Sequence, residues 1–444
     1  MRHPRNIIMI QSDQHRADWM GCAGARHVHT PALDALAARG VRFDQAYCSY
    51  PLCGPSRMSF LTGLHPFRNG IHTNDESLAS DRPTFAHALG LGGYRSVLCG
   101  RIHFSGPDQR HGFVERIFGD FNPSYPGGLQ AEIPPVYRRG SSNGRHAVEN
   151  AHTSDSYYFL DYDEGVTRAA EEYLATHAAQ PDPEPLALCV GYFMPHSPYA
   201  APERFVAQAR ALAEHMPPVW PGRDDLNHWE RGWIEHQKLS DLQPADYREA
   251  RIQYAAMIAY MDERIGRVLA AAEALPGETL VLYWSDHGEA VGDNGNIAKG
   301  CLAETSLHTP LIVAPLRAGD CGLGEGGRVW RQPVSNVDLA PTLCDCAGAP
   351  PIPDADGMSL CPVLAGSADE DWWARRPIFA EVSIFPQLPP ARMVRRGRYK
   401  YVYYHDDRDT LFDIAADPTE QEDLLSRRLG IFDAHPLADE IAAL

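Results

Sequence analysis

The first predicted strand is Asn6-Ile7-Ile8-Met9-Ile10-Gln11, and Ser12-Asp13-Gln14 follow it directly. Its run of four apolar residues favours a buried strand. In folds built on a parallel sheet, ligands bind at the carboxyl ends of the strands, which is where Asp13 and Gln14 lie. Taken alone, Asp13 is better explained as a loop residue that caps the next turn. Other segments of the chain repeat this pattern of a predicted strand followed by polar residues, and they make a functional role for Asp13 and Gln14 more plausible than the stretch alone does.

Strand and helix patterns alternate along most of the chain, which predicts an α/β fold with a large, mostly parallel sheet flanked by helices. Further strands are expected over residues 95–99, 186–193, 279–284 and 311–314. A helix is predicted after Thr30 as N-cap, with Pro31 at its first position and Gly40 past its end. A long amphipathic helix is expected from Ala245 to about Leu275.

Two stretches interrupt the alternation, residues 119–155 and 200–245, and both are predicted to be insertions that wall a binding site. We expect a large first domain over residues 1–365 and a small C-terminal α+β subdomain over residues 366–444. In the subdomain, Arg392–Tyr404 predicts a β-hairpin that turns near Arg396-Gly397, and helix signals start at Glu420.

The charge balance constrains the partners. Among 444 residues, 40 are Lys or Arg and 58 are Asp or Glu, giving a formal net charge of −18. Such a chain repels nucleic acid and anionic membranes, and small anions need a strongly localised positive site. The first apolar run is too short for a signal peptide or a membrane helix. The ten cysteines are irregularly spaced, which predicts free thiols and a cytoplasmic protein.

The segment Cys53-Gly54-Pro55-Ser56-Arg57 is the most informative one for function. It places a cysteine just before a proline that can begin a helix. The free N–H groups at a helix start favour an anion, and Arg57 adds a fixed cation. On these residues alone, a buried loop cysteine and a thiolate nucleophile remain open alternatives.

Other chemically active residues also follow predicted strands. They are Asp286, His287, Arg101, His103, His196 and, in a Gly/Asn-rich loop, Lys299. Asp286 and His287 can both reach one metal ion if Gly288 lets the backbone turn sharply. Alone, each position has a simpler explanation, such as a surface pair or a solvated lysine. Together they supply ligands for a hard divalent cation and cations for a tetrahedral oxyanion, with Cys53 between the two sets.

The chain resembles the type I sulfatases of the alkaline-phosphatase-like superfamily. Cys53–Arg57 and the following LTG match the family's C-x-P-x-R signature. The run from His29 to Gly40 is similar to the family's TPxLDxLAxxG, and residues 333–348 (PVSNVDLAPTLCDCAG) to its later DlaPTLldlaG. Leu411-Phe412-Asp413 with Asp417-Pro418 and Glu420 resembles the C-terminal LYDLxxDPxE. Residues 1–365 would then be the sulfatase catalytic domain.

The resemblance implies a mechanism. Cys53 would be oxidised to formylglycine by the formylglycine-generating machinery, and its hydrate would be the nucleophile. One divalent metal would be held by Asp13, Asp286, His287 and the modified Cys53, with Gln14 as a weaker ligand. Ca²⁺ is the expected ion, and Mn²⁺, Mg²⁺ and Zn²⁺ remain open.

The remaining roles are implied in the same way. Arg57 would orient the nucleophile, and Lys299 and Arg101 would meet charge on the sulfate oxygens. His196, with Lys299, would protonate the leaving alcohol. His103 would take the proton that releases sulfate. Asn74 would be a sulfate contact and His308 a residue on the substrate side.

Within the family, the chain resembles choline sulfatases and phosphonate monoester hydrolases, which share Asp-Gln at the first metal position and Asp-His at the second. Residues 100–115 (GRIHFSGPDQRHGFVE) resemble choline sulfatase in particular. Two features depart from the choline-sulfatase pattern: the chain ends at Leu444 without the longer tail, and no obvious Trp follows Phe118. In addition, Arg101 stands where many members of the family have Lys.

These features predict an enzyme that hydrolyses a small-molecule sulfate ester to alcohol and inorganic sulfate. A phosphonate monoester or phosphodiester hydrolase with the same nucleophile is the alternative, because both anions suit the same cations. A non-catalytic protein that binds a sulfated ligand is a third possibility, which the intact signature disfavours. A homo-oligomer is expected, with neither nucleic acid nor membrane as partner.

Overall fold

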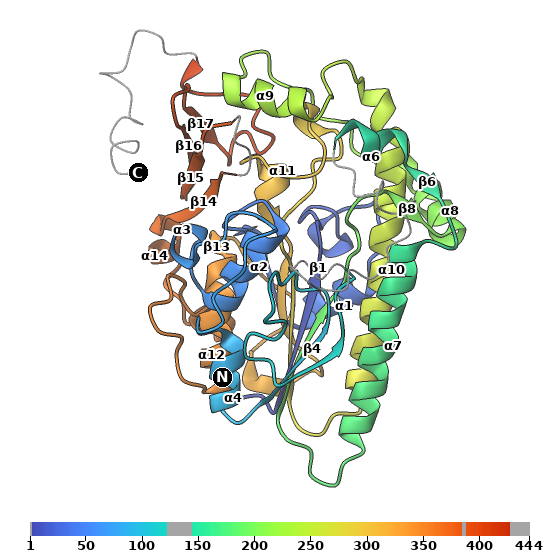
Figure 1. Cartoon of the computed structure of the whole chain (residues 1–444), viewed down its shortest axis with the longest axis vertical. Helices are drawn as coiled ribbons and strands as arrows, with labels where there is room; N and C mark the ends of the chain where they lie inside the picture. The colour runs from blue at the N-terminus through green and yellow to red at the C-terminus, as the bar shows by residue number, and fades with distance from the viewer. Residues whose placement is uncertain (1, 122–143, 384–387, 427–444) are drawn as a thin grey trace.

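The computed structural model describes residues 2–121, 144–383 and 388–426 (Figure 1). An eight-stranded sheet forms its centre. The strands, in spatial order, are β12 (Arg328–Trp330), β2 (Val41–Phe43), β11 (Leu311–Pro315), β9 (Thr279–Ser285), β1 (Asn6–Ser12), β7 (Leu186–Gly191), β4 (Arg95–Gly100) and β5 (Glu115–Phe118). β11 runs antiparallel to both of its neighbours, and the other pairs are parallel. The predicted large, mostly parallel sheet is confirmed.

Helices cover both faces of this sheet (Figure 1). Alternate residues of β1 enter different cores: Ile8 and Ile10 face the core that includes α7 and α10, whereas Ile7 and Met9 face the core of α2, α4 and α12. This is the alternation that a strand buried on both faces must have. The α-helices are α1 (Pro31–Arg39), α2 (Cys53–Thr62), α3 (Pro66–Asn69), α4 (Phe85–Leu91), α6 (Arg145–Glu149), α7 (Tyr158–Ala178), α8 (Glu203–Ala211), α9 (His228–His236), α10 (Arg248–Ala272), α11 (Glu304–Leu307), α12 (Leu339–Ala347), α13 (Cys361–Leu364) and α14 (Glu370–Arg375).

Short elements connect these layers. The 3₁₀ helices are Gly21–Ala23, Ala213–His215, Pro244–Tyr247, Asp293–Gly295, Asp320–Gly322 and Asn336–Asp338. Two minor sheets are formed by β10 (His308–Thr309), β3 (Ala46–Tyr47) and β13 (Val334–Ser335), and by β6 (His152–Thr153) with β8 (Ala200–Ala201). In the described residues, no helix is long and apolar enough to cross a membrane.

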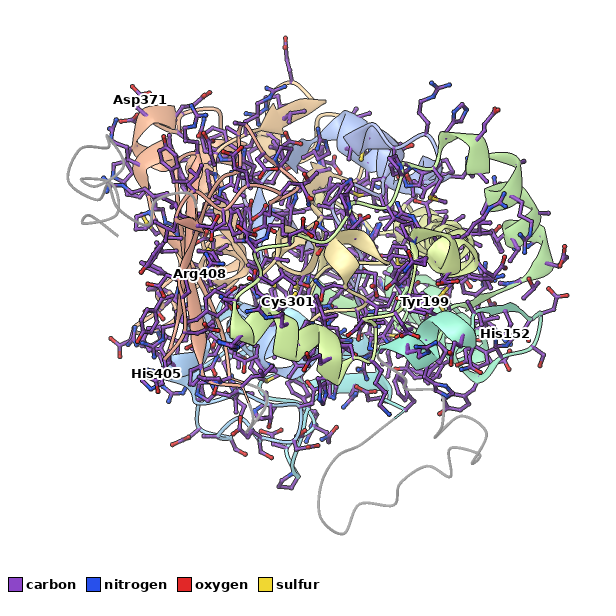
Figure 2. All side chains as sticks on the ribbon, turned by 90° about the horizontal axis from the view of Figure 1, so that it is seen from above. His152, Tyr199, Cys301, Asp371, His405 and Arg408 are labelled. Carbon is purple, nitrogen blue, oxygen red and sulfur yellow. The ribbon has the colours of Figure 1, made fainter. Side chains whose placement is uncertain are left out.

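A four-stranded antiparallel sheet forms the small C-terminal unit. Its strands are β14 (Ile378–Val382), β15 (Ala391–Arg396), β16 (Tyr399–Tyr404) and β17 (Thr410–Asp413). β15 and β16 form the predicted hairpin. Viewed from above, Asp371, His405 and Arg408 lie on the side of this sheet, and His152 and Tyr199 lie on the opposite side of the molecule (Figure 2). The helix signals from Glu420 onward give no α-helix up to Ser426, and the rest of that stretch lies outside the described residues.

The insertion predicted over residues 200–245 contains α8 and α9 and therefore has its own secondary structure. It packs on the loop that follows β9. The backbone N–H of Trp220 donates to Asp293 at 2.9 Å, and Trp233 lies where a side chain at Gly300 would stand. Residues 122–143 of the other predicted insertion lie outside the described residues.

A buried ion cluster joins the C-terminal sheet to the large domain. The ammonium of Lys400, on β16, lies 3.0 Å from Glu304 and 2.7 Å from Glu420. Arg395, on β15, lies 3.4 Å from the other oxygen of Glu304. All four side chains are buried, so two cations balance two carboxylates. Because Glu304 begins α11 directly after the loop that carries Lys299, the C-terminal sheet supports that loop.

The start of α1 corrects one sequence prediction. Thr30 precedes the helix as predicted, but its hydroxyl donates to Asp34 at 3.0 Å and does not cap the helix. Instead, the carboxylate of Asp262, on α10, accepts from the backbone N–H groups of Ala32 and Leu33, both at 2.9 Å. The cap therefore comes from a side chain that lies more than 200 residues away along the sequence.

Replacing Asp262 should consequently destabilise the fold. We expect Asp262→Ala to lower the free energy of unfolding by about 1–2 kcal/mol, the usual cost of removing a helix cap. Urea denaturation followed by circular dichroism measures this change. Glu263→Ala is the matched control, because its exposed ion pair with Arg204 is worth at most about 1 kcal/mol. Equal losses in both variants would contradict the capping role.

Candidate active site

Four segments meet at one edge of the central sheet. Asp13 follows β1, Asp286 and His287 follow β9, and Arg101 follows β4. Because β1, β7, β9 and β4 are mutually parallel neighbours, their carboxyl ends meet at the same edge. The amino end of α2 points at this edge with Cys53 as its first residue. The sheet thus brings together side chains that are up to 274 positions apart in the sequence.

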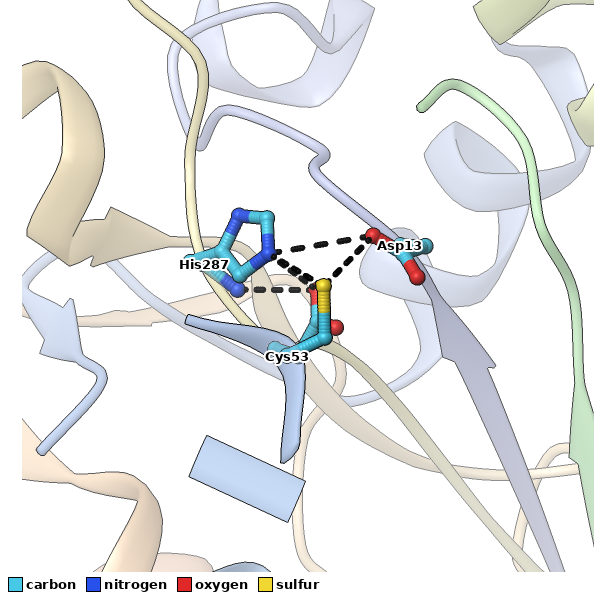
Figure 3. A group of neighbouring side chains, drawn as sticks. Asp13, Cys53 and His287 are labelled. Carbon is cyan, nitrogen blue, oxygen red and sulfur yellow. Dashed lines mark hydrogen bonds and ion pairs between the residues drawn. The ribbon is translucent and has the colours of Figure 1, made fainter. Parts of the chain in front are cut away.

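The centre of the site is a cluster of Asp13, Cys53, Asp286 and His287. One ligand atom from each residue lies within 4.8 Å of all the others. The Sγ of Cys53 is 3.2 Å from Nε2 of His287 and 3.6 Å from Oδ1 of Asp13. Figure 3 draws these contacts as dashed lines. Nε2 of His287 is 3.7 Å from Oδ1 of each aspartate. These spacings are those of donor atoms that can share one ion.

Arg57 holds the two aspartates in this arrangement. Its Nη2 donates to Oδ2 of Asp13 and its Nε to Oδ2 of Asp286, both at 2.8 Å. The Oδ1 atoms therefore remain directed toward Cys53 and His287. Cys53 and Arg57 are four residues apart on α2, so they lie on the same helix face. The four-residue spacing in the C-x-P-x-R signature therefore places Cys53 beside the two carboxylates that Arg57 contacts.

The helix that carries Cys53 differs slightly from the prediction. It begins at Cys53, and Pro55 is its third residue. Proline is tolerated there because the first-turn N–H groups have no partner within the helix. The N–H of Gly54 donates to Oδ1 of Asn74 at 2.8 Å. Asn74, predicted as a sulfate contact, thus caps the helix beside Cys53.

His287 presents a neutral ring nitrogen to this cluster. Its Nδ1 donates to the carbonyl of Gly288 at 3.1 Å, which leaves the Nε2 lone pair facing the cluster. Burial lowers the pKa of His287 to about 4, against the opposing effect of Asp286. The predicted sharp turn at Gly288 is not the reason for glycine, because this residue has no positive φ. A Cβ at Gly288 would instead lie 2.2 Å from the carbonyl of Thr305.

Arg101 and His103 form the next layer. Nε of Arg101 donates to Oδ2 of Asp13 at 2.7 Å, and Nη2 donates to Nδ1 of His103 at 2.9 Å. Asp120 accepts from Arg101 at 3.3 Å and from the backbone N–H of His103 at 3.0 Å. Burial and the charge of Arg101 lower the pKa of His103 to about 3, so its ring is neutral at pH 7.

Gly191, the last residue of β7, permits this arrangement. The N–H of Arg101 donates to the carbonyl of Gly191 at 2.9 Å. A Cβ at Gly191 would lie 1.8 Å from the carbonyl oxygen of Arg101, so no other residue fits here without moving that backbone.

Lys299, His196 and Gln14 form a connected group. Nζ of Lys299 lies 2.6 Å from Nε2 of His196 and also donates to Oε1 of Gln14. Burial, followed by the charge of Lys299, lowers the pKa of His196 well below its ordinary value. Gln14, predicted as a weaker metal ligand, uses its amide oxygen for Lys299 and its amide nitrogen for Glu289.

His308 lies away from this cluster. Its Nε2 contacts the carbonyl of Asp44 at 2.8 Å, and its ring stacks on Tyr47 at 5.5 Å. It lines a separate cavity of about 330 Å³ together with Arg16, Asp18 and Arg395. The described contacts therefore do not bring it to Cys53, and its role on the substrate side stays a prediction.

Three supporting carboxylates are not evident from the sequence. Asp120 orients Arg101, Glu289 orients Gln14, and Asp163 on α7 accepts from the N–H groups of Phe193 and Met194 at 2.8 and 2.9 Å. Asp163 thereby fixes the segment between β7 and His196. Glu289 follows His287-Gly288 directly, and that adjacency is the one signal that could have identified it.

The supporting carboxylates make the charge of the site more negative than its cations alone suggest. In the described residues, a network of hydrogen bonds joins the cations Arg57, Arg101 and Lys299 to four carboxylates, directly or through Gln14; these are Asp13, Asp286, Asp120 and Glu289. Burial raises the pKa of Glu289. Burial would also raise the pKa of Asp13, but the neighbouring cations outweigh this effect and hold that pKa well below the usual range. A divalent cation would make the total charge of this group positive. The donor set, two carboxylate oxygens and a neutral imidazole, suits such an ion.

Comparison with known proteins agrees with this arrangement. The sulfatase family model matches residues 5–349, and a model for the C-terminal part of N-sulphoglucosamine sulphohydrolase matches residues 292–430. The chain belongs to the sulfatase family and is an alkaline-phosphatase-like sulfatase, a hydrolase. The resemblance inferred from the sequence is thereby confirmed, and the family supports hydrolysis of sulfate esters.

Individual relatives are similar over nearly the whole chain. A choline-sulfatase from Rhizobium meliloti is 32% identical over 96% of this chain and 84% of its own length. The phosphonate monoester hydrolase of Agrobacterium radiobacter has a solved structure with a TM-score of 0.76 at 24% identity, covering 99% of this chain and 94% of that one. A structure bound to its substrate D-glucosamine-2-N,6-O-disulfate also has a TM-score of 0.76, at 22% identity, with 100% and 96% coverage. The two structures share the fold.

The contact between Glu289 and Gln14 gives a prediction. Glu289→Gln would set two amide NH₂ groups against each other, so the Gln14 amide would turn and present its N–H groups to Lys299. We expect kcat/KM for a sulfate ester to fall roughly 10- to 100-fold, as for other supporting residues around a metal site. Circular dichroism should show a retained fold.

The exchange of both residues provides the control. In the double variant Gln14→Glu with Glu289→Gln, the amide at 289 again donates to the carboxylate at 14, which accepts from Lys299. Activity should recover in part relative to Glu289→Gln alone. Recovery would separate the orienting role from a general loss of packing, and a further loss would contradict it.

Proposed function

We propose that this protein hydrolyses a small-molecule sulfate ester to an alcohol and inorganic sulfate, using a formylglycine hydrate made from Cys53 and one divalent metal ion. The observation that carries this proposal is the buried cluster of Asp13, Cys53, Asp286 and His287, with Arg57 fixing both aspartates. Asp13, Asp286 and His287 would hold the ion, and Ca²⁺ is the first candidate because two of the three donors are carboxylates.

The bound ion would act as a Lewis acid that stabilises negative charge and promotes deprotonation of the nucleophilic hydroxyl. Gln14 would be a further ligand if its amide oxygen leaves Lys299. Mn²⁺, Mg²⁺ and Zn²⁺ remain alternatives, because an imidazole is part of the donor set.

The environment of Cys53 disfavours an unmodified thiolate nucleophile. Burial, together with the neighbouring Asp13, raises the pKa of the Cys53 thiol to about 12. At pH 7 the thiol is therefore neutral, whereas a nucleophilic cysteine needs a low pKa. Oxidation to formylglycine would replace it with an aldehyde whose hydrate supplies a hydroxyl nucleophile.

The surrounding side chains then have distinct tasks. Arg57 orients the nucleophile through the aspartates. Lys299 and Arg101 provide positive charge where the sulfate oxygens become more negative. The ammonium of Lys299, 2.6 Å from His196, lets this pair hold and deliver a proton to the leaving alcohol. His103, neutral and buried, is assigned the proton whose removal releases sulfate.

The alcohol half of the substrate is proposed from the relatives and the charge. The choline-sulfatase relative at 32% identity and the net charge of −18 favour a cationic or neutral alcohol, and choline sulfate is the first substrate to test. A phosphonate monoester or phosphodiester is the alternative, because a monoanionic diester suits the same three cations. Asn74, which borders Cys53 through Gly54, is proposed as a contact for the bound anion, and His308 for the alcohol.

Further assignments complete the proposal. The catalytic domain spans residues 1–365 and the C-terminal subdomain residues 366–444. The protein acts in the cytoplasm as a homo-oligomer, depends on formylglycine-generating machinery, and binds neither nucleic acid nor membrane. The ten free cysteines fit a reducing compartment.

The state of Cys53 is the first test. Active protein should contain formylglycine at position 53, which lowers the mass of the Cys53 peptide by about 18 Da, the loss of H₂S and gain of oxygen. Cys53→Ala should abolish turnover without unfolding the protein. Cys189→Ala, a buried cysteine on β7, serves as the control and should keep activity. An active enzyme with an unmodified thiol at position 53 would contradict the formylglycine mechanism.

Leaving-group dependence tests the proton donor. His196→Ala should lower kcat/KM for alkyl sulfates by roughly 10²–10⁴-fold, the usual contribution of general acid catalysis. Activated aryl sulfates need little protonation and should lose far less. His405→Ala is the control, because His405 is exposed on the side of the C-terminal sheet (Figure 2). Equal losses on both substrate types would remove His196 from this role.

A substrate panel separates the remaining functions. We expect kcat/KM to be highest for sulfate esters among choline sulfate, 4-nitrophenyl sulfate, an aryl phosphonate monoester and bis(4-nitrophenyl) phosphate. Turnover should disappear with a chelator and return with a divalent ion. A preference for the phosphorus esters would establish the alternative. No turnover at all by metal-replete protein with modified Cys53 would indicate a non-catalytic binding protein.

A further inference from the structure

Two thiols outside the active site lie in contact. The Sγ of Cys346 is 3.2 Å from the Sγ of Cys361. Cys346 is the penultimate residue of α12, and Cys361 is the first residue of α13. All ten cysteines lie in the described part of the chain, and all ten are free thiols. Among the hydrogen-bonding contacts of these ten thiols, this is the one that joins two sulfur atoms, and sulfatase chemistry has no use for it.

Neighbouring side chains hold the two sulfurs together. The N–H of Leu360 donates to Oγ1 of Thr342 at 2.8 Å, and the hydroxyl of Ser359 donates to Asp345 at 2.6 Å. Both bonds fasten the residues just before Cys361 onto α12. Because the S–S bond length is about 2.05 Å, joining the sulfurs requires an approach of about 1.1 Å. The short helix α13 has four residues and can supply this movement.

The two thiols differ in exposure. Cys361 is partly exposed, whereas Cys346 is fully buried. A soluble oxidant therefore reaches Cys361 first, and Cys346 is the sulfur nearest to it. Cys361 is thus placed to react with the oxidant, and Cys346 is placed to resolve the mixed disulfide that results.

We propose that Cys346 and Cys361 form a reversible disulfide when the protein meets a low-molecular-weight disulfide such as oxidised glutathione. Cys361 attacks one sulfur of the oxidant, which releases one thiol and leaves a mixed disulfide. Cys346 then attacks the Cys361 sulfur and releases the second thiol. In sum, two cysteine thiols become one protein disulfide and the oxidant is reduced to two thiols.

The bond would close a loop that supports the nucleophile helix. The loop between the cysteines contains Asp356, whose N–H donates at 2.8 Å to the carbonyl of Gly63, the residue that directly follows α2. The Asp356 carboxylate accepts from the N–H of His65 at 2.9 Å. The disulfide thus reinforces the far end of the helix that starts at Cys53 without touching the site.

Peptide mapping of the full-length protein provides the test. Cleavage before aspartate separates Cys344, Cys346 and Cys361 onto the fragments 338–344, 345–353 and 356–368. After incubation with oxidised glutathione and blocking of free thiols, fragments 345–353 and 356–368 should be linked, with a loss of about 2 Da from their summed mass. Dithiothreitol should separate them.

Thermal unfolding gives a second readout. Oxidised protein should unfold at a midpoint about 3 °C higher than reduced protein, since the link closes a loop in the unfolded chain. Cys361→Ser should lose both the link and the shift. Cys22→Ser is the matched control, because Cys22 is another partly exposed cysteine, and it should keep both.

The outcomes decide the proposal independently of sulfate hydrolysis. Glutathione retained on Cys361, or thiols left reduced, with no linkage between the two fragments would overturn it. A link from Cys344 to either fragment would also contradict it. A linkage in the absence of any esterase activity would leave it standing, because it depends on neither Cys53 nor a metal ion.

Discussion

The site depends on one buried guanidinium. Arg57 is fully buried and donates to Asp13, Asp286 and the carbonyl of Arg101, which follow three different strands of the sheet. Burying this charge is costly unless every donor is used and both carboxylates are matched. The same contacts position the start of α2, because Arg57 and Cys53 share a helix face. The edge of the sheet, the start of α2 and the positions of Asp13 and Asp286 thus depend on a single side chain.

The electrostatics of the site differ from what its cations suggest. The sequence draws attention to Arg57, Arg101 and Lys299, which imply a positive pocket inside an acidic protein. The structure adds Asp120 and Glu289, so that the three cations are already matched by carboxylates. Attraction for an anionic ester would then come from the divalent ion rather than from the side chains alone. Metal binding and substrate binding would consequently be coupled.

The sequence predicted the strands and the residues at their ends, because apolar runs and the residues that follow them are local patterns. Asp13, Asp286, His287, Arg101 and Cys53 were therefore predictable as a group. The partners of these residues were not. Asp120 acts on Arg101 from beyond β5, and Asp262 caps α1 from another helix, so both depend on tertiary packing. Glycine at 288 was predictable, but its reason, close approach to Thr305, was not.

The ion cluster beneath the C-terminal sheet has a consequence for biosynthesis. Glu304, which ends the Lys299 loop, is neutralised by Lys400, whose other partner is Glu420. Translation delivers Cys53 long before residue 420, so the ion cluster that supports the loop cannot form until residue 420 has left the ribosome. In the finished fold Cys53 is only 1% exposed. If Cys53 is converted to formylglycine as proposed, the interval between its emergence and the arrival of the C-terminal strands would be the period in which the modifying machinery reaches it.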